Sequence, residues 1–224
     1  MLQYRHEWKH RIDLSDMITL RQRLGEVMQP DSHAVKGHYF IRSLYFDDAQ
    51  DTALREKIDG INKREKFRIR YYDLNTSIIH LEKKSKQNGL GTKEVANLTI
   101  EQASNIVNGN WNELLYDPQP LVRELYCKMK NQGLRPKTIV DYTREPFVYP
   151  PGNVRVTLDY DIRTGLHCTD FLNPDCITVP VRDAPVLLEV KWDNYLPIII
   201  QNMVQLKDRP AAAFSKYAAC RIYD

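Results

Sequence analysis

The segment KFRIRYYDLNTSIIHLEKKSK (66–86) has a charged or ionisable side chain at every second position of two consecutive strand-like runs. These positions are Lys66, Arg68, Arg70, His80, Glu82 and Lys84. Because successive side chains of a β-strand point to opposite faces, one face of this predicted hairpin is strongly basic and contains one carboxylate. An antiparallel sheet with one face in water shows the same alternation, so the hairpin alone does not distinguish a solvated face from a ligand-binding one.

The same alternation recurs in other predicted strands. The first strand contains R-x-E-x-K (5–9), and later ones contain DYTRE (141–145), R-x-T-x-D (155–159) and VLLEVKW (186–192). Several strands therefore each combine one or two cations with an occasional carboxylate. This recurrence favours a common ligand-binding face over a separate solvated face on each strand.

Period-2 runs predict eight strands, separated by turn residues. The strands are expected near 3–13, 39–47, 64–73, 77–86, 91–97, 137–149, 153–162 and 185–192. Asn88-Gly89 and Gly91 predict a hairpin turn between the fourth and fifth strands. Eight mainly antiparallel strands with short helices are typical of a sandwich or of a closed barrel, and periodicity alone does not choose between them.

Short helices are expected between the strands. Ser15 is a candidate N-cap for a helix that carries Ile18, Leu20 and Leu24, and Thr99 begins a capping box with Gln102. The carboxylates of Asp47 and Asp48 are interpreted as N-terminal caps of the helix that follows them, not as catalytic groups. Three further helices are expected, near 49–58, 119–131 and 210–222.

The overall composition is that of a globular protein, and we expect one domain over residues 1–224. The formal net charge is only +3, so a strongly basic site must come from the arrangement of charges. Between Lys57 and Lys93 the chain has ten Lys/Arg and four Asp/Glu residues. The sequence has no apolar run of membrane-spanning length and no Cys-x-x-Cys pair, and we therefore expect a cytoplasmic protein with structural thiols.

If the charged faces line the inside of a barrel, the interior is positively charged and contains a few acids. The cationic side chains of such an interior repel one another when it is empty. We therefore expect a highly charged anion to occupy it and to neutralise them. Polyphosphate and nucleoside triphosphates have the required charge density. The isolated carboxylates could then bind Mg²⁺ or Mn²⁺, which bind through carboxylates and substrate phosphates together.

Eight short motifs span nearly the whole chain. They are YRHEWKHRI (4–12), IRSLYFDD (41–48), FRIRYY (67–72), HLEKKSK (80–86), VDYTREPF (140–147), VRVTLDYDI (154–162), LLEVKW (187–192) and FSKY (214–217). Together they resemble the polyphosphate-polymerase domain of the vacuolar transporter chaperone (VTC) family, within the CYTH-like superfamily of triphosphate tunnel metalloenzymes. The resemblance implies an α+β, mainly β fold: an eight-stranded antiparallel closed barrel with peripheral helices. It also implies a Mn²⁺ or Mg²⁺ cofactor and transfer of the γ-phosphate of ATP onto a growing inorganic polyphosphate or pyrophosphate acceptor.

The resemblance further implies roles for individual residues. Catalytic contacts are expected from Arg68, Arg70, Lys84, Arg144, Arg155 and Lys216. Further substrate contacts are expected from Lys9, Lys57, Lys93, Tyr142, Lys191 and Ser215. Glu189, aided by Glu7, is expected to bind the metal ion.

Two positions depart from the family pattern. Lys57 stands where an arginine is expected, which keeps the charge but not the bidentate fork of a guanidinium. Arg5 stands where the broader superfamily has the first glutamate of E-x-E-x-K. This second change disfavours a hydrolase or cyclase that binds two metal ions tightly.

Two alternative functions remain open from the sequence, a triphosphatase and a non-catalytic binding module, and a third, nucleic-acid binding, is disfavoured. A triphosphatase on the same fold would release orthophosphate, whereas a polymerase makes long chains and ADP. A non-catalytic module would bind polyphosphate or inositol polyphosphates without turnover. A nucleic-acid binder is disfavoured, because the aromatic residues of FRIRYY (67–72) alternate away from the arginines and so are not placed for stacking beside them.

Overall fold

The computed structural model describes residues 5–34, 36–88, 90–211 and 213–222 of the chain. Its main feature is a ten-stranded antiparallel sheet in which eight strands follow one path, β1-β10-β8-β7-β3-β4-β5-β6. The strands of this path are β1 (His6–Ile12), β3 (Tyr39–Asp47), β4 (Arg64–Tyr72), β5 (Asn75–Gln87), β6 (Leu90–Leu98), β7 (Arg135–Tyr149), β8 (Val154–Thr164) and β10 (Val186–Trp192). Two short strands, β2 (Gln29–Pro30) and β9 (Val179–Pro180), pair with β7 and β8.

The eight predicted strands are confirmed, with boundaries shifted by a few residues at most. β3 covers the predicted range 39–47, and β4 and β5 form the predicted hairpin. The short strands β2 and β9 were not predicted. Positions 3 and 4 of the first predicted strand, and Gly89 of the predicted turn, lie outside the described residues.

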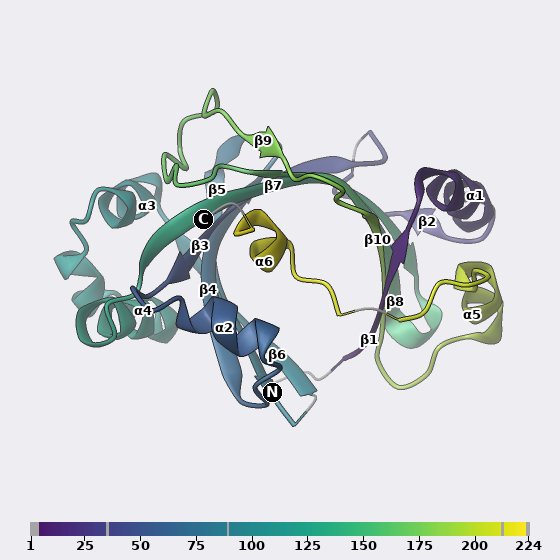
Figure 1. Ribbon diagram of the computed structural model, residues 1–224, viewed down its shortest axis with the longest axis horizontal. Coiled ribbons are helices and arrows are strands. Elements are labelled where there is room, and N and C mark those ends of the chain that lie inside the picture. The colour runs from purple at the N-terminus through teal and green to yellow at the C-terminus, as the bar shows by residue number, and fades with distance from the viewer. Residues whose placement is uncertain (1–4, 35, 89, 212, 223–224) are drawn as a thin grey trace.

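The sheet curves into a half-barrel that is open along one side (Figure 1). β1 and β6 are the two ends of the strand path, and within the described ranges they do not pair with each other. The expected closed barrel is therefore wrong, since a closed sheet has no edge strands and this one has two. Closure depends on one long-range pairing, and the period-2 pattern that predicts each strand contains no information about it.

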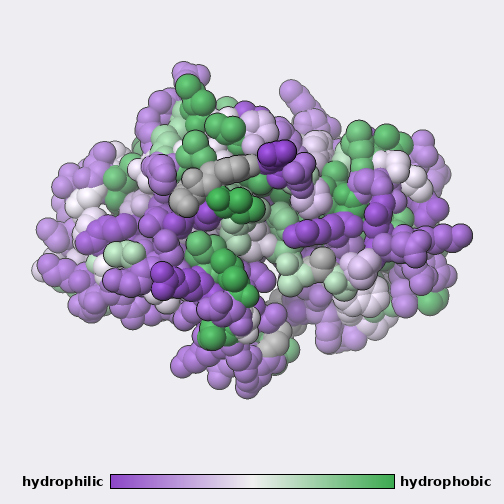
Figure 2. Space-filling view, in the orientation of Figure 1, coloured by the Kyte–Doolittle hydropathy of each residue, from purple (hydrophilic) through white to green (hydrophobic). Residues whose placement is uncertain are grey.

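Helices cover the convex face of the sheet. They are α1 (Leu14–Gly25), α3 (Ile100–Val107), α4 (Pro120–Asn131) and α5 (Ile198–Val204), with 3-10 turns η1 (Asn112–Tyr116) and η2 (Pro151–Asn153) elsewhere in the chain. Two further helices, α2 (Thr52–Ile58) and α6 (Lys216–Cys220), pack against each other, and α2 also contacts β3 and β4. α3 and α4 pack on one half, where Phe67 and Leu81 are buried with Ile106 and Leu125, and α1 and α5 pack on the other half. Each such side chain stabilises the fold by roughly 1.5–3 kcal/mol on burial. Figure 2 shows mostly hydrophilic residues on the outer sides of these helices.

None of the described helices combines the length and the apolar character needed to span a membrane.

The short helix α6 lies inside the curve of the sheet (Figure 1). Its Tyr217 stacks on Tyr45 of β3 at a ring-centroid distance of 5.0 Å, and the Tyr217 hydroxyl donates to the Asp47 carboxylate at 2.7 Å. Asp47 also accepts hydrogen bonds from the backbone N–H groups of Ala53 and Leu54 in the first turn of α2. One carboxylate thus joins β3, α2 and α6, and its predicted capping role is confirmed.

Two helix starts differ from the prediction. α1 is capped by Asp13, whose carboxylate accepts from the Asp16 N–H at 2.9 Å, whereas Ser15 lies inside the helix. Ile18 is 48% exposed, because the buried stripe of α1 consists of Met17, Leu20 and Leu24. The C-terminal helix begins only at Lys216, since Ala211 forms a β-bridge with His10 of β1. The capping box that begins at Thr99 is confirmed.

Candidate functional site

The helix α6 lies on the inner side of the curved sheet (Figure 1). Charged side chains gather on this side, where Lys216 of α6 contacts Asp159 of β8 and approaches Glu189 of β10. We define the charged concave face as nine basic and four acidic residues of the described chain. The basic residues are Lys9, Lys66, Arg68, Arg70, Lys84, Lys93, Arg144, Lys191 and Lys216, and the acidic ones are Glu7, Glu82, Asp159 and Glu189. If all of them are ionised, this face has an excess of five positive charges.

Glu189 on β10 is the acidic centre of one half of this face. Its carboxylate lies 3.3 Å from Lys9 Nζ and 3.4 Å from Lys191 Nζ. Lys216 Nζ and Arg144 Nη2 each lie 3.6 Å away. Burial alone would raise the pKa of this carboxyl, but the four cations hold the pKa well below its usual range. Glu189 is therefore a permanent negative charge at a point where β1, β7 and α6 meet β10.

Asp159 on β8 orients two cations of the same half. Its two carboxylate oxygens accept from Arg144 Nε and Nη2 at 2.6 and 2.7 Å, and one of them also accepts from Lys216 Nζ at 2.5 Å. Asp159 has no exposed surface. Burial opposes ionisation of its carboxyl, but Arg144 and Lys216 outweigh burial and lower the pKa. The bidentate pair fixes the plane of the Arg144 guanidinium.

Glu82 on β5 organises the other half. It accepts from Arg68 Nε and Nη2 at 2.8 and 2.6 Å and from Lys93 Nζ at 2.7 Å, and Arg70 lies 3.9 Å away. Arg70 donates to the Tyr142 hydroxyl at 3.0 Å. Burial would raise the pKa of Glu82, but Arg68, Arg70 and Lys93 lower it far below its usual value. The paired arginines predicted on β4 are thus buried side by side and held by one carboxylate.

The two halves face each other across the inside of the sheet. Repulsion from Arg68, followed by burial and by repulsion from Lys191, Lys66 and Lys9, lowers the pKa of Lys84 well below its ordinary value. Lys84 lies on β5 and Lys191 on β10, which are far apart in the strand order. The curvature of the sheet therefore brings cations from both walls within reach of one ligand.

Three predicted residues lie at the margin of this set. Lys57 on α2 lies close enough to Lys9 for repulsion to contribute, after burial and repulsion from Arg64, to a lowered pKa. Arg155 lies opposite Lys191 in the strand register, and its Nη2 donates to a carboxylate oxygen of Asp31 at 2.8 Å and to the Tyr39 hydroxyl at 2.7 Å. The Ser215 hydroxyl caps α6 by accepting from the Ala218 N–H.

The sequence assigned no site role to three members of the charged concave face: Lys66, Glu82 and Asp159. All three lie at the alternating positions of their strands, so the signal that placed Arg68 and Glu189 on this face also applies to them. Their importance is visible only in three dimensions, because Glu82 and Asp159 act by contacting cations from other strands and from α6.

The prediction that the aromatic rings of FRIRYY (67–72) point away from the arginines is confirmed for Phe67 and Tyr71 but wrong for Tyr72, whose ring centre lies 5.9 Å from the Arg70 guanidinium. Phe67 and Tyr71 are on the convex side, but Tyr45 and Tyr142 from other strands also reach the arginines. The Tyr45 hydroxyl accepts from Arg68 at 2.6 Å, and the ring of Tyr142 lies 4.6 Å from Lys216 Nζ. These rings are occupied by the protein's own cations, so they are not exposed platforms for stacking nucleobases.

The carboxylates Glu7 and Glu189 suit a divalent cation only in part. Both carboxylates contact the same two ammonium groups. Glu7 lies 3.5 Å from Lys9 Nζ and 3.3 Å from Lys191 Nζ, and Glu189 lies 3.3 Å and 3.4 Å from the same two atoms. In the described chain no three His, Cys, Asp or Glu side chains are grouped as metal ligands. Two carboxylates fit Mg²⁺ or Mn²⁺ when substrate phosphates supply further oxygens.

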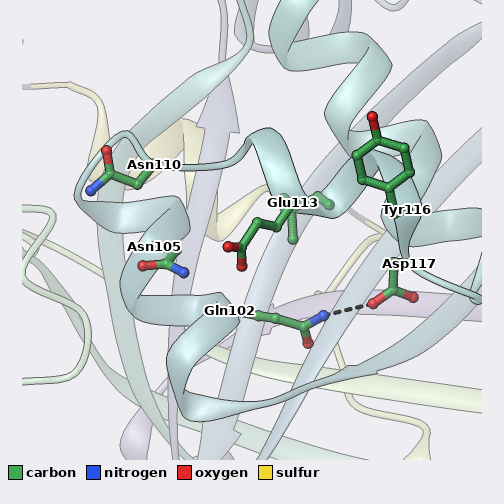
Figure 3. A pocket seen from close by; sticks show the side chains of 7 residues that line it. Gln102, Asn105, Asn110, Glu113, Tyr116 and Asp117 are labelled. Atoms are coloured by element: carbon green, nitrogen blue, oxygen red, sulfur yellow. Dashed lines mark hydrogen bonds between the residues drawn. The ribbon is translucent and has the colours of Figure 1, made fainter.

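A separate polar cavity of about 230 Å³ lies between α3 and η1 (Figure 3). Gln102 donates to the Asp117 carboxylate at 2.6 Å within it, and Asn105 and Glu113 are among the other lining residues. None of its lining residues belongs to the charged concave face. This cavity has no excess of positive charge, and we assign no function to it.

This chain resembles known proteins in its sequence pattern and in its fold. The VTC domain family model matches residues 4–222. A candidate adenylyl cyclase from Hippeastrum, described as having a dominant triphosphatase activity, has a similar fold, with a TM-score of 0.56 and 16% identity over 97% of this chain and 95% of that chain. A candidate adenylate cyclase from Bacillus halodurans has a TM-score of 0.48 and 13% identity over 84% of this chain and 80% of that chain. No curated relative matches by sequence. The chain belongs to the VTC domain family.

Proposed function

We propose that the protein transfers the γ-phosphate of ATP onto a growing inorganic polyphosphate chain on the charged concave face. The observation that supports this proposal is the excess of cations on that face. In the part of the chain that the structure describes, Lys66 and Lys84 have no carboxylate within ion-pair distance. A site of this kind repels itself when empty, and a ligand with several closely spaced negative charges neutralises it.

In the proposed reaction, a terminal phosphate oxygen of the acceptor chain attacks the γ-phosphorus of ATP. The bond between this phosphorus and the oxygen that bridges it to the β-phosphate breaks, and ADP leaves. The attacking oxygen is already ionised, so the reaction needs no strong general base. Catalysis of phosphoryl transfer then consists mainly of positioning and of stabilising charge on the phosphate oxygens.

The contacts on the charged concave face suggest a division of roles. Arg68, Arg70, Arg144 and Lys84 would hold the triphosphate, because they come from three strands and converge on the inside of the sheet. Lys216 would hold the terminal phosphate of the acceptor, since α6 presents it on the inner side of the sheet beside Arg144, with which it shares Asp159. Asp159 and Glu82 are positioning residues, which orient these cations before substrate arrives.

A divalent cation would be held by Glu189 and Glu7 together with phosphate oxygens of the substrate. When bound, such an ion supplies further positive charge to the phosphate oxygens. The lysines that surround both carboxylates already neutralise them, so we expect the ion to bind together with the nucleotide and not before it.

The test is to incubate the purified protein with ATP and Mn²⁺ or Mg²⁺ and to separate the products on a gel stained for polyphosphate. We expect long polyphosphate chains and an equivalent amount of ADP from the parent protein, and neither from Glu189→Gln. Orthophosphate without chains would contradict the polymerase and support a triphosphatase. Binding of polyphosphate without any turnover would instead support a non-catalytic module.

The triphosphatase is the second candidate because the Hippeastrum protein with a similar fold is described as having that activity. One position argues against it. Arg5, which stands in place of the first glutamate of E-x-E-x-K, donates to Asp193 at 2.7 Å. This position therefore contributes a cation in an ion pair and adds no carboxylate for a second metal ion.

A further inference from the structure

Three lysines lie next to one another across three strands of the charged concave face. In the strand register Lys66 of β4 is opposite Lys84 of β5, and Lys84 is opposite Lys93 of β6. Directly opposed residues of antiparallel strands have Cβ atoms about 5 Å apart, and like charges at such positions are destabilising. We call these residues the lysine row. A folded protein retains such a row at a cost in stability.

The lysine row has little compensating negative charge. Lys93 pairs with Glu82 at 2.7 Å, but in the described chain neither Lys66 nor Lys84 has a carboxylate within ion-pair distance. Two carboxylates lie near the row: Glu82, which Arg68 and Lys93 already contact, and Glu7 of β1, where burial would raise the pKa but Lys9, Lys191 and Lys84 lower it. The other groups around Lys66 are cations and one phenol. These groups are Arg68 (β4), Lys84 (β5), Lys93 (β6), Lys9 (β1), Lys57 (α2), Lys216 (α6) and Tyr45 (β3).

This surrounding charge disfavours the protonated form of Lys66 in the empty site. Burial, followed by repulsion from Arg68, Lys9, Lys57 and Lys216, lowers the pKa of Lys66 to about 7. Its ammonium also lies 5.6 Å from the ring centre of Tyr45, a weak compensation compared with a carboxylate. Around neutral pH a large share of Lys66 side chains is therefore uncharged while no anion is bound.

We propose that Lys66 is a substrate-binding residue of the lysine row, and that it takes up a proton from the solvent when a phosphate chain binds there. This inference rests on the proposed function, because it requires a polyphosphate or the triphosphate of ATP on the charged concave face. The proton moves from a buffer molecule to Lys66 Nζ, and no covalent bond between protein and substrate is formed. Lys84 and Lys93 provide the neighbouring contacts to successive phosphates.

The sign of the effect follows from linkage. A bound polyanion favours the ammonium form and returns the pKa of Lys66 towards the ordinary value of a lysine, so binding consumes a proton. At a pH where Lys66 is mostly uncharged in the empty protein and mostly charged in the complex, the affinity for the phosphate chain falls about tenfold per pH unit. We expect this contribution between pH 8 and 9.

The experiment measures binding of inorganic tripolyphosphate by titration calorimetry at pH 8 in buffers with different ionisation enthalpies. The key comparison is Lys66→Arg, because an arginine remains charged at every pH used. Protons exchanged by the ligand itself are the same in both titrations and cancel in the difference. We expect the parent to take up between half a proton and one proton more than Lys66→Arg.

Two further variants support the comparison. Lys66→Met should weaken binding and also lose the additional proton uptake, which covers the case in which Lys66→Arg does not fold. Lys130→Met, which changes an exposed lysine of α4, should bind and take up protons like the parent. Between pH 8 and 9 the parent should lose about tenfold more affinity than Lys66→Arg.

The outcomes separate the inference from the proposed function. Equal proton uptake by the parent and Lys66→Arg, with tripolyphosphate bound by both, would overturn the inference and leave the proposed function intact. No binding of tripolyphosphate to the parent at any pH would overturn both. An additional uptake of at least half a proton that disappears in Lys66→Arg and in Lys66→Met supports the inference.

Discussion

Asp159 and Arg70 illustrate how single buried charges depend on their partners. Removing one member of a buried ion pair leaves an uncompensated charge, which typically costs about 3–5 kcal/mol. Asp159 serves two cations, Arg144 and Lys216, and Arg70 lies 96% buried between the Tyr142 hydroxyl, which it reaches at 3.0 Å, and Glu82. At the scale of the residue, the carboxylates keep an excess of cations in place, and the cations are available to a ligand.

Asp159→Asn should lower both stability and activity. The amide keeps the shape of the side chain but removes the charge that Arg144 and Lys216 contact, so both cations lose their fixed positions. We expect kcat/KM for ATP to fall about 10- to 100-fold, equivalent to about 1.4–2.7 kcal/mol. Initial rates of ADP formation and thermal unfolding measure the two effects. Asp161→Asn, an exposed carboxylate of the same strand, is the control and should match the parent; a fully active Asp159→Asn would refute the positioning role.

Arg70→Ala should lower kcat/KM by 100-fold or more, equivalent to about 2.7 kcal/mol of transition-state stabilisation. The truncation removes a guanidinium from the inside of the sheet but leaves Glu82 paired with Arg68 and Lys93. Steady-state kinetics with ATP measure the loss, and Arg123→Ala on α4 provides a variant with an arginine removed elsewhere. If Arg70→Ala polymerises ATP as well as the parent, the strand β4 does not present this residue to substrate.

At the scale of the element, the alternation along each strand predicted which residues face inward. The predicted inward positions of β4 and β10, Arg68 and Glu189 among them, lie together on the concave side. Alternation is a local property, and strand geometry converts it directly into a face. The apolar run LPIII (196–200) lacked such a clear pattern, and it begins α5, whose Ile200 and Val204 are buried one turn apart.

The features that could not be predicted depend on contacts between distant segments. Whether β1 and β6 pair, and which cation Asp159 contacts, depends on the curvature of the whole sheet and on where α6 enters it. Arg155 illustrates this limit, because the resemblance implies a substrate contact for it but no sequence pattern indicates that its guanidinium pairs with Asp31 from a preceding segment. A local pattern therefore placed side chains on a face but did not assign their partners.

The position of α6 depends on Tyr217, and Tyr217→Phe tests this element. The phenol hydroxyl donates to Asp47 and accepts from Arg221, both at 2.7 Å, and its loss leaves the ring packing on Tyr45 intact. Losing these hydrogen bonds should cost about 1–2 kcal/mol, which lowers Tm by about 2–8 °C for a protein of this size. Circular dichroism melts measure the shift. Tyr116→Phe, at a position that is 84% exposed, should leave Tm unchanged.

At the scale of the whole molecule, the excess of cations lowers the stability of the empty protein and strengthens its binding of anionic ligands. Cations that are placed to bind a polyanion repel one another when the polyanion is absent. The empty protein is therefore less stable than the same fold would be without this repulsion. The most crowded position is Lys84, which lies between Lys66 and Lys93 in the strand register. The whole-molecule consequence is that relieving the repulsion should stabilise the empty protein and remove part of its affinity for phosphate chains.

Lys84→Met should therefore raise the Tm of the empty protein while it weakens the response to tripolyphosphate. Removing an unpaired cation from this position should add about 0.5–2 kcal/mol of stability, or about 1–8 °C in Tm. In the parent, tripolyphosphate at 100 times its Kd should stabilise by about 2.7 kcal/mol, and the variant should show a clearly smaller shift at the same concentration. Thermal melts with and without tripolyphosphate measure both effects, with sodium chloride at equal ionic strength as the control for screening. A lower Tm for empty Lys84→Met would show that Lys84 stabilises the fold, and would contradict the view that the concave face is built around an absent anion.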